Sequence, residues 1–354
     1  MEKPGYVPNF IDSEPRRLYL ELTSRCNLNC QICYRRAWTE GTGDLPGELL
    51  EALAQEAARF SEHPEVVLGG IGEPTHAPLF DRAVKLFASC RLTVTSNGIS
   101  LTEDRIAKLI AAHVNKLVIS VDGGDEEYYR IRGTDLQQVR AGLANLRRHS
   151  GGPTLWLQFV ASCDNIDSLR SVIDLAAQEK IHGVIISNLV PQTEEHSGKI
   201  LYSRYQNEAM RNLFNRVRNH SFLRGVNLVL PNYELKTIRR CRFIDEAAMM
   251  INYLGDVVPC YRLAHNGREY VFERPKEVVR HSFGSIKKQT LREIWNSEAY
   301  RRFRYTVFTN QYPSCMDCEL VDGCEIINST VWDCEGNMPT CGDCLWARNF
   351  VICP

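Results

Sequence analysis

Three cysteines near the N-terminus have a spacing that suits an iron–sulfur cluster. Cys26, Cys30 and Cys33 form a C-x3-C-x2-C triplet, and Tyr34 follows the last of them. Three thiolates bind three irons of a cubane [4Fe–4S] cluster, whose usual ligand set is four cysteines. The fourth iron is then open to a small molecule. The alternatives are a zinc loop or three unrelated buried thiols, although zinc sites more often use C-x2-C pairs.

A second group of cysteines lies in the C-terminal third. Nine of the fourteen cysteines follow residue 240: Cys241, Cys260, Cys315, Cys318, Cys324, Cys334, Cys341, Cys344 and Cys353. Disulfides are disfavoured in a reducing compartment, so metal ligation is the better explanation for this many thiols. The C-x2-C pairs 315/318 and 341/344 also fit a four-cysteine zinc site, which leaves the other thiols unexplained. We expect the two isolated cysteines, Cys90 and Cys163, to be core thiols.

Length and charge exclude several other classes. The chain has 354 residues and a net charge of −1, which suggests about two domains and no basic stripe for nucleic acid or an anionic membrane. Residues 1–5 lack the apolar core of a signal peptide, and no uninterrupted apolar run reaches the ~18 residues of a membrane span. These features predict a cytoplasmic protein without a membrane or nucleic-acid partner.

The elements that must position the first thiols follow a repeated β–α pattern. Between residues 17 and 191, short strands rich in Val, Ile and Leu alternate with amphipathic helical patterns. The predicted strands are 18–23, 66–71, 92–95, 117–121, 155–160 and 184–189. A full eight-unit barrel needs ~250 residues, which is more than this region has. The pattern therefore predicts an α/β fold with a partial (βα)6 barrel, whose functional loops lie at the C-terminal ends of the strands.

Polar and glycine-rich segments follow these strands. Gly69-Gly70-Ile71-Gly72-Glu73-Pro74 comes after the second strand, Asn97 after the third and Ser120 after the fourth, with Arg132 in the helix beyond; Asn165 and Leu189 follow the fifth and sixth. A Gly-rich turn or a Ser-x-Asp-Gly cap is by itself commonly structural. Their order at successive strand ends is what indicates one site. His76, close to the Gly-rich segment, is a further candidate for this site.

Taken together, these motifs over residues 17–195 resemble the radical SAM enzymes. The resemblance implies that the Cys26 triplet holds a [4Fe–4S] cluster whose open iron binds S-adenosylmethionine (SAM). It also implies that the cofactor is contacted by residues of the strand-end motifs: Tyr34, Gly70, Gly72, Glu73, Pro74, Asn97, Ser120, Arg132, Asn165 and Leu189. Arg132 suits the SAM carboxylate because its guanidinium forms two charge-assisted hydrogen bonds.

The C-terminal cysteines resemble the SPASM extension of such enzymes. A hairpin pattern over 247–263 contains Gly255-x4-Cys260, and a helical pattern bearing Leu291, Ile294, Trp295, Tyr300 and Phe303 precedes Cys315-x2-Cys318-x5-Cys324. The resemblance implies a small α+β domain with two auxiliary [4Fe–4S] clusters. It assigns Cys241 and Cys260 to the first and Cys315, Cys318 and Cys324 to the second. Spacing does not settle how Cys334, Cys341, Cys344 and Cys353 pair, and one thiol is spare.

These resemblances predict a radical SAM core over 1–195, a bridging segment over 196–240 and a SPASM domain over 241–354. The segment 332–347 further resembles radical SAM maturases of tungsten-containing aldehyde ferredoxin oxidoreductases. The expected partners are SAM, a protein or cofactor-carrying protein substrate, and a low-potential donor such as ferredoxin or flavodoxin. One alternative is a maturase of a ribosomally made peptide or of a protein side chain. A zinc-stabilised scaffold without catalysis is the other.

Overall fold

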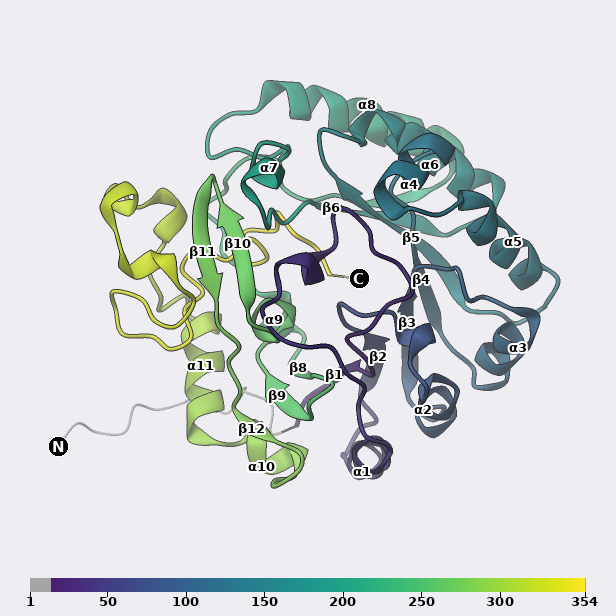
Figure 1. Ribbon diagram of the computed structural model, residues 1–354, viewed down its shortest axis with the longest axis horizontal. Coiled ribbons are helices and arrows are strands. Elements are labelled where there is room, and N and C mark those ends of the chain that lie inside the picture. Colours follow the sequence, from purple (N-terminus) through teal and green to yellow (C-terminus); the bar gives the residue numbers. More distant parts are fainter. Residues whose placement is uncertain (1–13, 354) are drawn as a thin grey trace.

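The computed structural model describes residues 14–353, and one curved ten-stranded sheet organises them (Figure 1). Its order is β12-β9-β8-β1-β2-β3-β4-β5-β6-β7. From β8 to β7 neighbouring strands are parallel, whereas β9 and β12 run antiparallel at one edge. The first seven strands are β1 (Arg17–Glu21), β2 (Glu65–Gly69), β3 (Arg91–Ser96), β4 (Lys116–Ser120), β5 (Thr154–Ala161), β6 (Gly183–Asn188) and β7 (Asn227–Val229).

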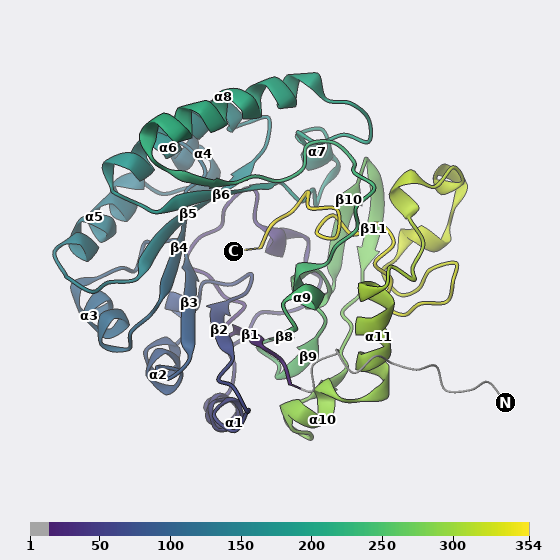
Figure 2. The same ribbon diagram turned by 180° about the vertical axis from the view of Figure 1, so that it is seen from behind.

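Helices cover the outer face of this sheet, as Figures 1 and 2 show. Loops cover the inner face, so both faces of the central strands are covered. All six residues of β6 are accordingly buried. Side-chain caps define several helix starts: Thr102 caps α3 and Asp135 caps α5. The helices of this layer are α1 (Gly47–Ala57), α2 (Phe80–Leu86), α3 (Glu103–Ala111), α4 (Asp125–Arg132), α5 (Leu136–Arg147), α6 (Leu169–Gln178) and α8 (Glu208–Arg224). The predicted partial barrel of six βα units is confirmed.

The inner face of the curved sheet is covered by loops rather than helices. The segment after β1 and the end of the chain both lie inside the curve (Figures 1 and 2). The loops that follow the strands contain short helices: η1 (Tyr34–Ala37), η2 (Pro74–His76), η3 (Ile166–Ser168) and α7 (Glu194–Ser197). Because the C-terminal ends of parallel strands share one edge of the sheet, the polar loops that follow them converge here.

The chain after residue 240 continues the same sheet. The predicted hairpin forms from β8 (Ala248–Ile251) and β9 (Asp256–Val258), and β8 pairs with β1. The other elements are α9 (Arg242–Asp245), η4 (Tyr261–Leu263), β10 (Gly267–Val271), β11 (Arg274–Val278), β12 (Gly284–Ser285), α10 (Leu291–Trp295), α11 (Glu298–Phe308), η5 (Cys315–Asp317), η6 (Val321–Gly323) and η7 (Ile326–Asn328). The cysteine-rich segment is thus joined to the core by backbone pairing.

Two local predictions were wrong. The helical pattern from Leu291 to Phe303 is two helices, because Ser297 takes an extended conformation and caps α11. The segment 196–240 contains α8 and β7, and β7 extends the main sheet; its role as a bridge stays a prediction. The boundaries at 195 and 240 stay predictions. Cys163 is exposed rather than a core thiol, whereas Cys90 is buried as expected.

Among residues 14–353, no helix is long and apolar enough to cross a membrane. The N-terminal residues 1–5, where we expect no signal peptide, lie outside the described residues.

Candidate functional site

The triplet loop is fastened to the scaffold at both ends. Arg35, two residues after the last cysteine, donates hydrogen bonds to the carbonyl oxygens of Ser24 (3.2 Å) and Leu28 (3.0 Å). The Gln31 amide donates to the Ile131 carbonyl oxygen at 2.8 Å, which ties the loop to α4. The loop therefore leaves β1 with a defined path across the inner face of the sheet.

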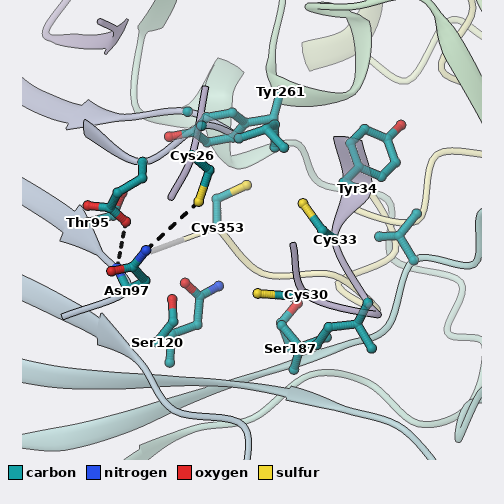
Figure 3. Close-up of a pocket in the computed structure, with 18 of the residues that line it drawn as sticks. Cys26, Cys30, Cys33, Tyr34, Thr95, Asn97, Ser120, Ser187, Tyr261 and Cys353 are labelled. Carbon is teal, nitrogen blue, oxygen red and sulfur yellow. Dashed lines mark hydrogen bonds between the residues drawn. The ribbon is translucent and has the colours of Figure 1, made fainter. Parts of the chain in front are cut away.

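The three triplet thiols line one cavity of about 260 Å³ (Figure 3). Burial raises the pKa of Cys26, and it raises that of Cys30 to about 11. A thiolate there needs a positive partner, which a metal cluster supplies. Of the predicted cofactor residues, the following also line the cavity: Tyr34, Gly70, Gly72, Glu73, Pro74, Asn97, Ser120 and Arg132. The motifs that follow β2, β3 and β4 and the triplet loop are thus brought together.

The Gly-rich loop approaches the triplet loop too closely for side chains. A Cβ on Gly72 would lie 2.1 Å from the Thr23 carbonyl oxygen, and Gly70 has φ +119°. The buried Glu73 carboxylate accepts hydrogen bonds from the hydroxyl of Ser96 (2.8 Å) and the amide of Asn97 (2.7 Å). Glu73 thereby locks the end of β3 to this loop, so it positions the site.

Arg132 enters the cavity from α4 as half of an ion pair. Its Nη2 lies 2.6 Å from Asp122 Oδ2, and the Asp122 side chain is fully buried. Desolvation opposes the guanidinium charge, but the Asp122 carboxylate outweighs it and raises the pKa of Arg132. Asp122 Oδ1 also accepts from the Val160 amide at 2.8 Å. Asp122 therefore holds the Arg132 side chain at the ends of β4 and β5, beside Ser120.

Three sequence candidates lie outside the cavity lining. Asn165 is buried, and its side-chain amide donates to the carbonyl oxygens of Asp122 and Val160, both at 2.9 Å. Leu189 is buried behind the strand end, and His76 is exposed. His76 was wrong as a site residue, because η2 turns its side chain to solvent. Asn165 instead fixes the loop that carries Asp122.

The sequence reasoning missed several polar side chains of the cavity. Gln158 of β5, Ser187 and Asn188 of β6, and Gln192 beyond it line the cavity. The carbonyl oxygens of Asn188 and Gln192 are buried without a hydrogen-bond partner among the described residues. Their position near the ends of β5 and β6 could have indicated that they belong to the site, because the strand ends converge there. Their side-chain types alone did not indicate a site.

Five C-terminal thiols line a second, smaller cavity: Cys241, Cys260, Cys341, Cys344 and Cys353. The first four are absent from the lining of the triplet cavity, which Cys353 also lines. Burial raises the pKa of all four, and the neighbouring thiols Cys260 and Cys344 raise that of Cys241 further. Buried thiols that repel one another as anions are the donor set expected around an iron–sulfur cluster. We call these four residues the inner quartet.

Four further cysteines lie between η5 and the loop after η7: Cys315 begins η5, Cys318 and Cys324 flank η6, and Cys334 follows η7. Burial, the Asp343 carboxylate and the neighbouring Cys334 raise the pKa of Cys315 to about 12. The turns link Cys318 to Cys324, since Val321 donates to the Cys318 carbonyl oxygen (3.2 Å) and Cys324 to that of Val321 (3.3 Å). We call Cys315, Cys318, Cys324 and Cys334 the outer quartet.

The predicted zinc site is not formed. Its four cysteines divide between the quartets, with Cys341 and Cys344 in the inner one and Cys315 and Cys318 in the outer one. Within residues 14–353, no three His, Cys, Asp or Glu side chains converge closely enough to bind one metal ion. A cubane cluster spreads its thiolates more widely than a single ion does.

A buried charge network lies beside the triplet loop and the C-terminal cysteines. Arg262 donates to Glu269 (2.9 Å) and Asp343 (3.0 Å), and Lys276 donates to Asp343 at 2.8 Å. All four side chains are at most 2% exposed. The Tyr34 hydroxyl donates to Glu269 at 3.3 Å, so the network reaches the triplet loop. Two cations balance two anions, as burial requires.

A second buried cluster supports the Gly-rich loop. His265 hydrogen-bonds to Glu21 through Nε2 (2.9 Å) and to Glu40 through Nδ1, and its ring stacks on Trp38 with centroids 3.8 Å apart. Desolvation opposes its charge, but the hydrogen bonds to the two carboxylates raise its pKa to about 9. Glu21 also accepts from the Ile71 amide at 3.4 Å. His265 is thus an imidazolium that joins β1 to the C-terminal segment.

Comparison with known proteins agrees with this arrangement. The model of the radical SAM superfamily matches residues 20–191, and that of the SPASM iron–sulfur cluster-binding domain matches residues 241–319. The tungsten-containing aldehyde ferredoxin oxidoreductase cofactor-modifying protein of Pyrococcus furiosus is 34% identical over 349 residues, which are 95% of this chain and 96% of that protein. The AdoMet-dependent heme synthase of Methanosarcina barkeri is 26% identical over 83% of this chain and 86% of its own.

The fold is also found in solved structures. SuiB of Streptococcus suis bound to S-adenosylmethionine superposes with a TM-score of 0.63 at 17% identity, over 89% of this chain and 73% of its own. The matched models span both the cavity with the triplet and the start of the cysteine-rich segment. The protein therefore belongs to the radical SAM superfamily and is a SAM-dependent iron–sulfur enzyme with a SPASM domain.

Proposed function

We propose that this enzyme matures a tungsten-containing aldehyde ferredoxin oxidoreductase. In this role it abstracts a hydrogen atom from the cofactor of the oxidoreductase or from the protein that carries it. One observation carries the proposal, which is the 34% identity to the Pyrococcus furiosus cofactor-modifying protein along 95% of the chain. Identity over both the core and the cysteine-rich segment favours a shared substrate more than a shared fold alone would.

In this proposal the cavity binds SAM against the triplet. Cys26, Cys30 and Cys33 hold a [4Fe–4S] cluster, which supplies the electron that cleaves SAM into methionine and a 5′-deoxyadenosyl radical. Arg132, oriented by Asp122, receives the SAM carboxylate. The backbone of Gly70 and Gly72 receives the amino group, because a ligand can approach these positions closely. Glu73 and Pro74 fix that loop.

The remaining cofactor contacts follow from residues at the cavity wall. We assign polar contacts with SAM to Asn97 and Ser120, and an adenine contact to the backbone after Tyr34. Asn165 and Leu189 would act from behind the lining, by holding the ends of β5 and β6. Each of these roles is part of the proposal and rests on motif position and on where the residue lies.

We assign one auxiliary [4Fe–4S] cluster to each quartet, so that the enzyme holds three clusters. Each quartet supplies the four thiolates that a complete cubane needs, without an open iron. Two closed clusters suit electron transfer better than substrate binding. A low-potential ferredoxin or flavodoxin is the proposed electron donor, and the proposed setting is an anaerobic cytoplasm.

The substrate side of the cavity is neutral and hydrogen-bonding. Gln158, Ser187, Asn188 and Gln192 carry no charge, and the nearby Trp346 supplies an aromatic face. Such a lining suits a group rich in N–H and O–H donors and excludes water around a reactive radical. A heterocyclic cofactor and a peptide segment both offer such donors, so the test must separate them.

The test uses anaerobically reconstituted enzyme, SAM, dithionite and the oxidoreductase produced in cells that lack this enzyme. We expect 5′-deoxyadenosine to form in proportion to added oxidoreductase, and the mass of its extracted tungsten cofactor to change. The matched control is the Cys26/Cys30/Cys33→Ala variant, which should give neither. A mass change confined to an oxidoreductase peptide would favour the side-chain maturase. No stimulation by the oxidoreductase would contradict the proposed substrate.

A further inference from the structure

One thiol lies in the wall between the two cavities. The cavity of the triplet and that of the inner quartet share four lining residues, Tyr261, Trp346, Val351 and Cys353. Figure 3 shows Cys353 among the side chains that surround the triplet thiols. The segment that carries Cys353 is fixed there, because the Ile352 amide donates to the Ser187 hydroxyl at 2.9 Å. Cys353 thus has a defined place beside the radical site.

Cys353 is left over when the thiols are grouped. The triplet and the two quartets leave three of the fourteen cysteines, which are Cys90, Cys163 and Cys353. Cys90 is buried in the hydrophobic core, and Cys163 is exposed. Of these three, Cys353 alone lines the cavity of the triplet. Among the five thiols of the inner cavity, too, only Cys353 also lines the triplet cavity, so we take it as the thiol that is not a cluster ligand.

The neighbour of Cys353 in the shared wall leaves its S–H hydrogen unused. Trp346 lines both cavities with Cys353, and an indole N–H only donates, so it does not accept the S–H hydrogen. One tyrosine of the lining is engaged elsewhere, since the Tyr34 hydroxyl donates to Glu269 at 3.3 Å. An S–H bond is also weaker than the C–H and alcohol O–H bonds around it.

The same cavity contains independent signs of a ligand. Asn188 is 1% exposed and Gln192 is 4% exposed, and the side-chain carbonyl oxygen of each has no partner among the described residues. Their amide groups are used, since Asn188 donates to Phe350 (3.0 Å) and Gln192 to Val190 (2.9 Å). Buried acceptors without donors are costly, so a ligand with N–H or O–H groups is expected to fill the cavity beside Cys353.

We propose that Cys353 is a catalytic residue that donates a hydrogen atom to the carbon radical formed in this cavity. The S–H bond breaks and a C–H bond forms, which leaves a thiyl radical on Cys353. One electron from the low-potential donor and one proton from water then restore the thiol. The inference rests on the radical chemistry proposed above, and it excludes Cys353 from the cluster ligands.

Solvent deuterium tests this role without a known substrate. The reconstituted enzyme is incubated anaerobically with SAM and dithionite in D2O, where thiols exchange their hydrogen for deuterium. Without substrate, the 5′-deoxyadenosyl radical takes its hydrogen from the most available donor. We expect the wild-type enzyme to give 5′-deoxyadenosine with one added deuterium by mass spectrometry. Cys353→Ala and Cys353→Ser should lose that mass shift, because neither offers a weak S–H bond. The control Cys163→Ala should keep it.

Iron and acid-labile sulfide are measured in the same samples. Unchanged iron in Cys353→Ala with loss of deuterium supports hydrogen donation. Loss of one cluster's iron would instead make Cys353 a ligand and overturn the proposal. Deuterium that persists in both Cys353 variants, or that is absent from the wild type, would overturn it as well. If no 5′-deoxyadenosine forms at all, the proposed radical function fails with it, so the two failures are distinguishable.

Discussion

The buried His265 cluster makes stability depend on pH in a predictable direction. Between Glu21 and Glu40 the pKa of His265 is about 9, against 6.5 for an unperturbed histidine. A folded-state pKa above the unfolded value stabilises the fold fully below pH 6.5, and this stability is lost as pH rises through 9. The shift corresponds to about 3 kcal/mol at ~1.4 kcal/mol for each pH unit. The guanidinium of Arg280 also lies 3.8 Å from Glu40.

The assay is urea unfolding of the anaerobic, reconstituted enzyme at pH 6.5 and pH 9, followed by tryptophan fluorescence. We expect the free energy of unfolding to fall by about 3 kcal/mol between these pH values in the wild type. His265→Gln keeps polar contacts but no charge, so it should lower stability by a similar amount at pH 6.5 and flatten the pH dependence. The matched control is His220→Gln.

His220 forms a comparable pair with Asp174 at 3.0 Å, but both side chains are partly exposed. Removing that pair should cost at most about 1 kcal/mol and leave the decline with pH unchanged. The reasoning is refuted if His265→Gln shows the same decline between pH 6.5 and 9 as the wild type. A flat wild-type profile would refute it equally, because the two carboxylates would then not hold the imidazolium.

Two further substitutions test the loops and the charge network. Gly72→Ala places a methyl group 2.1 Å from a backbone carbonyl oxygen of the triplet loop, so equilibrium dialysis should show loss of SAM binding. The control Gly41→Ala has no atom within 4 Å of the added methyl group and should bind SAM normally. Asp343→Asn leaves Arg262 and Lys276 without one of their buried anions. Urea unfolding should therefore show a free energy of unfolding lower by about 3–5 kcal/mol. A decrease below about 1 kcal/mol, which is typical of an exposed pair, would contradict the burial argument.

The convergence of the motifs was predictable from the sequence because parallel strands end at one edge. Gly72, Asn97, Ser120 and Arg132 are far apart in the chain, yet each follows a strand that the Val-, Ile- and Leu-rich pattern marks. Their presence in one cavity follows from that topology. The role of Gly72 was also predictable from the sequence, since the close approach of two loops requires a residue without a side chain.

The missed features depend on contacts between distant segments. His265 meets Glu21 across 244 positions, and nothing in the local sequence of either residue indicates that pairing. The grouping of Cys341 with Cys241 depends on the path of the tail, where the Arg240 amide donates to the Ala347 carbonyl oxygen at 2.8 Å. Spacing between cysteines contains no information about such a path. Tertiary packing therefore determines both the pairing of His265 with Glu21 and the grouping of Cys341 with Cys241.

The most direct test measures iron, acid-labile sulfide and 5′-deoxyadenosine in the wild type and in the Cys26/Cys30/Cys33→Ala variant. Three cubane clusters predict about 12 irons per chain, falling to about 8 in the variant, because both quartets keep their clusters. The wild type should cleave SAM to 5′-deoxyadenosine, and the variant should not. Zinc in place of iron, no loss of iron in the variant, or SAM cleavage that survives without the triplet would contradict the account.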